Sequence, residues 1–303
     1  KGWLHVLRDQ KKIQFIILRD KSGQVQITHW KPNDEGLAEL ISTLTSESAL
    51  MITGKVIDNP QVKLGGLEIQ LESLTVDNLA ESPLPFEPYG EAENLPALDY
   101  RLDWRFMDLR RRESLLIFKV QTTLEMALRE YWVERGYIEI HSPKLMGSPS
   151  ESGAELFELN YFETKAFLAQ SPQFYKQMAM AAGFEGVFEI GPVFRADPSF
   201  TSRHMTEFTS IDLEISWIKD EDDVMSNQER MLQYAYQRVK DAHQDEIRQV
   251  FGIEIEVPQV PFPRITMAEA HEILKEANYQ LPQDKKNDLD PGGERAIGDY
   301  IKR

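Results

Sequence analysis

The sequence predicts an α+β protein of two domains, in which a small closed β-barrel precedes an antiparallel sheet flanked by helices. Residues 1–79 consist of short runs that alternate apolar and polar side chains between turn signals, as half-buried strands do. A proline-rich stretch interrupts this pattern at 80–98, and helical spacing and a long hairpin follow it. A length of 303 residues is enough for two domains, since single domains most often contain about 100–200 residues.

Five candidate strands make up the N-terminal domain, residues 1–79. Turn signals such as Asp20-Lys21-Ser22-Gly23 and Gly65-Gly66 separate them. The strands are GWLHVLR, KIQFIILRD, GQVQITHW, ALMITGKVI and LEIQLESLTV. Five strands with a basic, aromatic-bearing face are typical of an OB-fold, a small barrel that binds oligonucleotides. The alternative is a small β-barrel with no such role.

The charge is unevenly distributed along the chain. A net charge of -16 argues against nonspecific coating of nucleic acid, which requires Lys and Arg facing the phosphates. Between Lys1 and Lys31, however, seven basic residues stand against two acidic ones, a net +5 that leaves -21 on the remainder. A basic N-terminal module on an acidic body predicts a selective reader of nucleic acid.

The composition is that of a soluble protein. With 41% hydrophobic residues the chain can bury a core, yet it has no apolar run of the ~18 residues that a membrane span needs. The absence of cysteine excludes disulfides and thiolate metal sites and fits a reducing cytoplasm. We expect a cytoplasmic protein with no membrane partner. The opening KGWLH already has a strand-like pattern, so we expect the native protein to begin earlier.

Residues 80–112 are predicted to form a linker and hinge. The stretch SPLPFEPYGEAENLP combines prolines with acidic residues, which favours a stiff, extended chain over a packed element. Residues 113–303 then form the second domain. Within it, residues 113–134 have helical spacing that ends near Gly136, and the acidic run 220–223 is expected to be a solvated turn.

A second helix is predicted over QFYKQMAMAA. Ser171 supplies a capping hydroxyl, Pro172 starts the helix, and Gly183 follows its end. Gln173 and Lys176 therefore lie one turn apart at the helix N-terminus, an end that attracts anions.

A long hairpin is predicted from the strands VFEIGPVFRA and FTSIDLEISWI around a polar loop. In the second strand, Asp212 and Glu214 point to one face, and the apolar residues point to the other. These apolar residues are Ile211, Leu213, Ile215 and Trp217. Carboxylates on a central sheet face require a partner, because an unpaired buried charge is costly.

Two segments carry a resemblance to a known family. FRADPSFTSRHMTEF resembles motif 2 of the class II aminoacyl-tRNA synthetases, and AQSPQFYKQM is similar to a segment shared by the aspartyl and asparaginyl enzymes of that class. On these motifs the chain is identified as a member of the aspartyl-tRNA synthetases of the archaeal and eukaryotic type. The resemblance covers Gly2 to at least Gly298 and implies an OB-fold joined to a class II catalytic domain.

The resemblance implies ATP-dependent ligation of L-aspartate to tRNA through aspartyl-adenylate, with Mg²⁺ as a further cofactor. Arg195 would be the catalytic residue, because its guanidinium would neutralise the α-phosphate during attack. Arg203 and His204 would hold the pyrophosphate, and Phe208 would stack on adenine. Asp197 stands where the family usually has Glu, and it joins the other four as an ATP-binding residue. Without the motif, an arginine at a strand end is more often a surface ion pair.

The aspartate site is implied by three segments. Glu151 lies in SPSESGA, which resembles the family's mobile Ser-Glu-Gly-Gly loop, although Ser152 replaces the first glycine. Lys176 would bind the side-chain carboxylate of aspartate, Gln173 its α-amino or carboxylate region, and Asp212 its ammonium group. The alternative for a helical lysine is simple solvation.

The N-terminal module would bind the anticodon. Phe15 would stack on a base and Gln26 would read a base edge, as in single-stranded RNA recognition, with Arg8 nearby. His5 stands where relatives restricted to tRNA(Asp) tend to carry tryptophan, and Pro60 lies near the loop where they tend to carry lysine. Neutral His5 offers a donor or an acceptor by changing tautomer, so we expect both tRNA(Asp) and tRNA(Asn) as partners.

Pro143 resembles the motif 1 proline of the class II dimer seam, which implies a homodimer; its alternative is an ordinary turn proline. No metal ligands are expected within residues 1–303. Motif 3, the aspartate-binding arginine and the metal-binding acids are all expected beyond Arg303. Two functional alternatives stay open: an asparaginyl-tRNA synthetase, and a non-catalytic or asparagine-synthetase-like paralogue.

Overall fold

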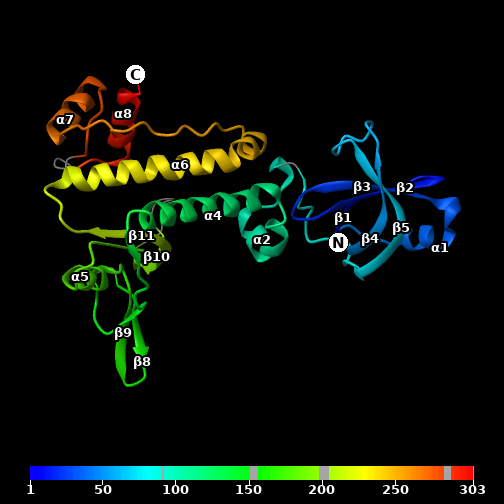
Figure 1. Cartoon of the computed structure of the whole chain (residues 1–303), viewed down its shortest axis with the longest axis horizontal. Helices are drawn as coiled ribbons and strands as arrows, with labels where there is room; N and C mark the ends of the chain where they lie inside the picture. Colours follow the sequence, from blue (N-terminus) through cyan, green and yellow to red (C-terminus); the bar gives the residue numbers. More distant parts are fainter. Residues whose placement is uncertain (91, 151–155, 198–204, 283–287, 303) are drawn as a thin grey trace. The chain divides into compact units, whose positions relative to one another are not determined.

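The chain folds into two compact units, Lys1–Arg111 and Arg112–Arg303, and each is described by itself. Figure 1 labels the elements of the computed structural model along the chain. The described residues are 1–90, 92–150, 156–197, 205–282 and 288–302.

The first unit contains a closed barrel of five strands in the order β1-β2-β3-β5-β4. Neighbouring strands are antiparallel except for β3 and β5, which run parallel. The strands are β1 (Gly2–Asp9), β2 (Ile13–Arg19), β3 (Gln24–Trp30), β4 (Ala49–Asp58) and β5 (Leu67–Asn78). The five-stranded OB-fold barrel predicted from the sequence is confirmed.

Alternation along each strand places one apolar row inside the barrel. Leu4, Ile16, Ile27 and Leu50 are each at most 1% exposed and form one cluster, and each such side chain contributes roughly 1.5–3 kcal/mol by leaving water. A helix that the sequence did not predict, α1 (Glu35–Ser42), adds Ile41 to this cluster.

The segment after the barrel carries three short helices: η2 (Ala92–Asn94), α2 (Leu98–Asp103) and α3 (Arg105–Asp108). The Asp108 carboxylate is 2% exposed and accepts hydrogen bonds from Arg101 at 2.8 Å and from Arg105 at 2.6 Å. The stretch that was expected to be extended, residues 80–98, contains the short turn η2, and the buried ion pair closes the helical turns that follow it.

In the second unit, the helices α4 (Arg112–Val133) and α6 (Glu221–Phe251) lie antiparallel (Figure 1). Lys119 bonds to Glu246 near one end of the pair, and Tyr131 bonds to Asn227 at the other. The predicted helix after residue 112 and its end before Gly136, where φ is +81°, are confirmed.

The two helices cover one face of a hairpin formed by β10 (Gly186–Phe194) and β11 (Glu207–Ile215). Phe188 and Ile190 of β10 pack against Trp132 of α4, with ring centroids of Phe188 and Trp132 4.8 Å apart. The predicted hairpin is confirmed. A short strand, β6 (Ile138–Glu139), pairs with β10 in parallel.

Two local predictions in this region were wrong. The acidic run is not a solvated turn, because Asp220 caps α6 and the next three acidic residues form its first turn, where negative charge interacts favourably with the helix dipole. Trp217 does not continue the apolar face, because β11 ends at Ile215 and Trp217 has φ 61° and is 85% exposed.

Two smaller groups of elements also belong to the second unit. A three-stranded sheet contains β7 (Leu145–Met146), β8 (Glu158–Tyr161) and β9 (Thr164–Leu168). The helices α7 (Met267–Glu276) and α8 (Pro291–Ile301) share a small apolar core. No helix in the described part of the chain is long and apolar enough to cross a membrane.

Candidate active site and nucleic-acid interface

The β10–β11 register gathers the predicted catalytic residues on one sheet face. Residues directly opposite each other in an antiparallel pair share a face, and Glu189 pairs with Asp212. Phe208 lies on the same face as Asp212, four residues and about 13 Å along the strand. Arg195 extends the ladder beyond β10, since its N–H donates to the Thr206 carbonyl at 2.9 Å.

The opposite face of the hairpin explains why these polar groups lie where they do. Phe188, Ile190 and Leu213 point toward α4 and α6 and bury apolar surface there. Strand alternation then directs their neighbours away from this core. The apolar side chains of one face therefore pack against the helices, and the charged side chains lie on the other face.

Lys176 joins this polar face from the first turn and a half of α5 (Gln173–Ala181), which lies against β10 and β11. Its Nζ is 2.6 Å from Asp212 Oδ1 and 3.2 Å from Glu214 Oε2. Burial lowers the pKa of Lys176, but hydrogen bonds and charges from the two carboxylates together raise it above its ordinary value. The ammonium is therefore charged, and its side chain is only 13% exposed.

The start of α5 differs in detail from the sequence prediction. Pro172 occupies the N-cap position rather than the first helical position, so no side chain caps the helix in the usual way. Ser171 Oγ instead accepts a hydrogen bond from the Gln173 N–H at 3.3 Å. Gln173 is half-buried at the helix start, one turn before Lys176.

A second charged pair on this face was missed by the sequence reasoning. Glu189 is 4% exposed; it pairs with Lys144 Nζ and accepts a hydrogen bond from the Ser142 N–H at 3.1 Å. It lies directly opposite Asp212. The signal was present, since a carboxylate interrupts the apolar run VFEIG and can be buried there only with a partner.

The remaining predicted residues of this site are placed as follows. Arg195 is exposed, with its Cζ 5.9 Å from the centre of the Phe208 ring. Asp197 is half-buried after the end of β10, and Pro143 is exposed after β6. Three predicted residues lie outside the described residues: Glu151, Arg203 and His204.

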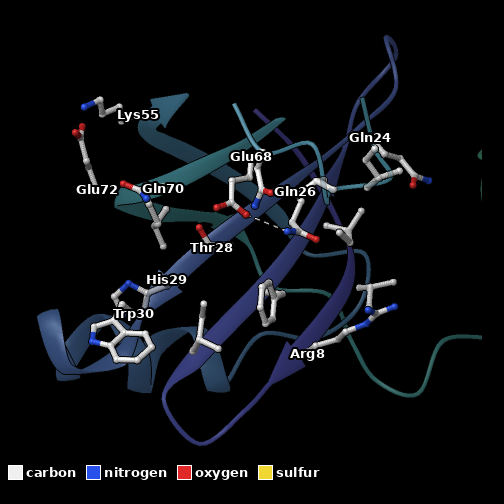
Figure 2. A pocket seen from close by; sticks show the side chains of 18 of the residues that line it. Arg8, Gln24, Gln26, Thr28, His29, Trp30, Lys55, Glu68, Gln70 and Glu72 are labelled. Atoms are coloured by element: carbon white, nitrogen blue, oxygen red, sulfur yellow. Dashed lines mark hydrogen bonds between the residues drawn. The ribbon is translucent and has the colours of Figure 1, made fainter. Parts of the chain in front are cut away.

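The barrel carries a groove of about 1230 Å³ on its outer face (Figure 2). Four of the five predicted anticodon residues line it: His5, Arg8, Phe15 and Gln26. Pro60 is exposed and does not line the groove, although its neighbours Asn59 and Gln61 do.

Strand pairing places a row of dissimilar groups across the groove. Arg8 pairs with Phe15, Phe15 with Thr28, and Thr28 with Gln70, so one line crosses β1, β2, β3 and β5. A cation, an aromatic ring, a hydroxyl and an amide thus share one face. This combination suits a single-stranded nucleic acid, whose bases stack on aromatic rings while cations follow its backbone.

Gln26 is held in a defined orientation within this groove. Its Nε2 donates to Glu68 Oε2 at 3.1 Å, and the register places the two residues side by side on β3 and β5 (Figure 2). One of the two N–H groups of the Gln26 amide is engaged in this way, and its Oε1 can accept a hydrogen bond from a base edge.

His5 stands at an irregularity of β1. The β1–β2 register shifts between Leu4 and Val6, so His5 is the extra residue of a β-bulge, a feature that re-aims side chains. Its ring lies edge to face with Tyr89, with centroids 4.5 Å apart and planes at 89°. Burial and the charge of Arg19 lower the pKa of His5 below 6.5, against an opposite effect of Glu47. His5 is therefore neutral at pH 7.

The described residues contain no group of three or more His, Asp or Glu side chains arranged to hold a metal ion. They do place a guanidinium near an aromatic ring, since the Arg195 Cζ lies 5.9 Å from the centre of the Phe208 ring. These groups fit a phosphate and an adenine, respectively.

Residues 97–302 match the family described as tRNA synthetases class II (D, K and N), and residues 1–77 match the OB-fold nucleic acid binding domain. The chain is 44% identical over 301 residues to the aspartate–tRNA(Asp) ligase of Thermococcus kodakarensis, across 99% of this chain and 67% of that protein. It is 42% identical over 305 residues to the aspartate–tRNA(Asp/Asn) ligase of Archaeoglobus fulgidus, across 99% and 68%.

Solved structures of aminoacyl-tRNA synthetases also match this chain over nearly its whole length. The asparaginyl-tRNA synthetase from Pyrococcus horikoshii, complexed with asparaginyl-adenylate, superposes with a TM-score of 0.88 at 32% identity, across 99% of this chain and 68% of that one. A putative aspartyl-tRNA synthetase from Leishmania major superposes with a TM-score of 0.84 at 25% identity, across 99% and 67%. Because both kinds of enzyme match, the fold alone does not separate aspartate from asparagine.

Proposed function

The chain belongs to the class II tRNA synthetases (D, K and N), and from this premise we propose that it is an aspartate–tRNA ligase acting on both tRNA(Asp) and tRNA(Asn). It is an aminoacyl-tRNA synthetase by family. Residues 1–79 would bind the anticodon, residues 113–303 would belong to the catalytic domain, and residues 80–112 would connect these two domains.

One observation carries the choice of amino acid: a charged lysine stands among carboxylates on the polar sheet face. Lys176 supplies a counter-charge for the side-chain carboxylate of aspartate, and Asp212 supplies one for its ammonium group. Without substrate, Asp212 and Glu214 neutralise the lysine. Asparagine would present a neutral amide to Lys176, whereas the side-chain carboxylate of aspartate would gain a charge-assisted hydrogen bond from it, roughly twice as strong as a bond between neutral groups. This favours aspartate over the asparaginyl alternative.

Adenylation follows from the spacing along β11. Aspartate held at Asp212 and adenine stacked on Phe208 would be separated by about 13 Å along the strand. An oxygen of the substrate's α-carboxylate attacks the α-phosphorus of ATP, and the bond to pyrophosphate breaks. Arg195 would stabilise the negative charge that develops on the α-phosphate, since a preorganised cation acts most strongly there. Asp197, Arg203, His204, Gln173 and Glu151 would complete the contacts to ATP and aspartate.

Transfer to tRNA then needs no covalent enzyme intermediate. A hydroxyl of the terminal ribose attacks the carbonyl carbon of aspartyl-adenylate, and AMP leaves. Positioning and charge stabilisation supply the rate. Mg²⁺ would neutralise the phosphates of ATP when bound; the described residues contain no group of three or more His, Asp or Glu side chains that could hold it.

Dual tRNA specificity is supported by the groove residues. The two anticodons differ in their last base, cytosine against uracil, which exchanges an N4–H donor for an O4 acceptor. His5 is neutral and lines the groove, and Pro60, beside the groove between the lining residues Asn59 and Gln61, has no side-chain hydrogen bond to offer. Such a site has little with which to penalise either base. Pro143, exposed after β6, would contribute to a homodimer interface.

The test is aspartate-dependent pyrophosphate exchange by the full-length protein, with asparagine as the matched control. We expect exchange with aspartate alone, and equal activation of asparagine would refute the assignment. Charging of tRNA(Asp) and tRNA(Asn) side by side tests the second part. A preference for tRNA(Asp) above about a hundredfold, equivalent to roughly 2.7 kcal/mol, would show that the enzyme discriminates.

A further inference from the structure

His5 is held in the groove by packing and not by a hydrogen bond. Its Nδ1 is buried, and within the described part of the chain this atom has no hydrogen-bond partner. The contact that holds the ring is the edge-to-face pair with Tyr89, at 4.5 Å between centroids. Tyr89 lies 84 positions further along the chain, outside the five strands, so the barrel alone does not fix this imidazole.

Tyr89 is itself held firmly. The Arg19 Cζ lies 4.3 Å from the centre of the Tyr89 ring, a distance at which a cation is attracted to the face of the ring. Arg19 Nη2 donates to both oxygens of Glu47, at 3.2 and 3.0 Å, and the Glu47 side chain is 1% exposed. Arg110 is a second cation on Glu47, and Arg19 Nη1 donates to the Arg110 carbonyl at 3.2 Å.

The chemistry of imidazole gives this arrangement a consequence. In a neutral histidine, the hydrogen bond made by one ring nitrogen sets which nitrogen carries the proton. A carboxylate or carbonyl at Nδ1 would place the proton there and make Nε2 an acceptor only. The Tyr89 ring contributes no carboxylate or carbonyl oxygen of this kind, and Nδ1 of His5 has no hydrogen-bond partner among the described residues.

We propose that Tyr89 is a positioning residue for base recognition, which fixes the orientation of the His5 ring while leaving its tautomer free. Nε2 then accepts from the N4–H of cytosine in one tautomer and donates to the O4 of uracil in the other. This rests on the proposed function, in which His5 reads the last anticodon base. It adds that the capacity to read two bases comes from the residue behind His5.

The charges around His5 support the neutral ring that this requires. Arg19 and Arg110 stand against the single carboxylate of Glu47, so the network next to the Tyr89 ring keeps a net positive charge. A protonated imidazole there would face repulsion in addition to its desolvation.

The first experiment reads the tautomer directly. Full-length protein labelled with ¹⁵N-histidine is studied by NMR without tRNA at pH 7.5, and the His5 signals are assigned with His5→Gln. We expect intermediate ¹⁵N shifts at both ring nitrogens, as a mixture of tautomers gives. One pure tautomer overturns the proposal. Because no tRNA is present, this outcome is independent of whether the enzyme charges tRNA(Asn).

The second experiment tests the positioning role. Tyr89→Leu removes the ring, and Tyr89→Phe keeps it as the matched control. We expect Tyr89→Leu to raise KM for both tRNAs about tenfold, near the upper end for an aromatic pair, with aspartate-dependent pyrophosphate exchange unchanged. Tyr89→Phe should restore wild-type KM, because the ring and not the hydroxyl makes the contact.

The outcomes separate the two hypotheses. Unchanged tRNA KM in Tyr89→Leu overturns the positioning role. Loss of pyrophosphate exchange in the same variant, without rescue in Tyr89→Phe, also overturns it by showing a general structural role. Mixed tautomers and a raised KM in an enzyme that charges only tRNA(Asp) uphold Tyr89 as a positioning residue and refute the dual specificity.

Discussion

The groove of the barrel and the polar face of the β10–β11 hairpin use charge in opposite ways. On the hairpin, each buried charge has an ionic partner: Lys176 pairs with Asp212 and Glu214, and Lys144 pairs with Glu189. In the groove, the row across the strands consists of a ring, a hydroxyl, an amide and Arg8, and the other cations of the lining, Lys55 and Lys63, are exposed. A single substitution in a site of paired charges should therefore have a large effect, because it leaves the partner charge unpaired. A single substitution in a site of stacking and edge contacts should reduce affinity by a smaller amount.

The largest effect should come from breaking the compensation on the hairpin. Lys176→Met leaves aspartate's side-chain carboxylate without a counter-charge, and removing one partner of a buried charged pair costs about 3–5 kcal/mol. We expect aspartate-dependent pyrophosphate exchange to fall below detection. Lys165→Met makes the same change at a side chain that is 63% exposed and should be active. Near-normal exchange by Lys176→Met would remove the basis for the aspartate site.

A smaller loss is expected at Arg195. Arg195→Ala should reduce the adenylation rate by about 2.7–4 kcal/mol, as loss of one preorganised transition-state donor does, while the KM for aspartate changes little. Single-turnover adenylation measures the rate, and Arg248→Ala, a similarly exposed arginine on α6, is the control. Equal losses in aspartate binding and in adenylation rate would contradict a role at the α-phosphate.

In the groove, Phe15→Ala should cost about 1–3 kcal/mol in tRNA recognition, the range for one base stacked on an aromatic ring. The effect should appear in KM for tRNA and leave aspartate-dependent pyrophosphate exchange unchanged, because exchange needs no tRNA. Phe15→Tyr keeps the stacking face and should stay within about twofold of wild type. A fall in exchange in Phe15→Ala would indicate damage to the fold.

The two regions also differ in how far the sequence predicted them. The barrel strands followed from alternation, because period-2 patterns directly report which residues face the core. The acidic run that caps α6 was read as a turn, because a cap and a turn use the same residues and only the helix that follows separates them. Lys176 and Asp212 were placed together on a resemblance to the family, and the structure brings them to 2.6 Å.

The contacts that escaped prediction join positions far apart in sequence. Glu189 reaches Lys144 and Ser142 across 45 and 47 positions, and Tyr89 reaches His5 across 84. The carboxylate within VFEIG indicates that Glu189 needs a partner, but no local pattern identifies the partner in either pair. The bulge that presents His5 also has no signature in GWLHVLR, because the extra residue is defined by the register with β2, which the sequence of one strand does not contain.

The smallest predicted effect is a pH-dependent change in tRNA preference. Imidazolium donates from both nitrogens and accepts from neither, so protonated His5 could still bond to uracil O4 but would lose its bond from cytosine N4–H. Because burial and Arg19 lower the pKa of His5 below 6.5, this change should occur only in acid. As the pH falls from about 7.5 through 6.5, the ordinary pKa of histidine, toward the lowered pKa of His5 in the folded protein, kcat/KM for tRNA(Asn) should rise relative to tRNA(Asp) by about two- to tenfold. That range corresponds to one hydrogen bond of about 0.5–1.5 kcal/mol.

Stability should change in the same pH window. The unfolded chain binds a proton at His5 before the folded chain does, so the contribution of the neutral ring is complete above pH 6.5 and is lost as the pH falls through that value toward the lowered pKa of the folded state. His5→Gln is the matched control for both effects, because a glutamine amide has a donor and an acceptor but does not titrate. Its tRNA preference should be flat over the range, and its melting temperature should fall less in acid than that of the wild type. A wild-type ratio that is equally flat would show that His5 does not contact the base that distinguishes the two anticodons.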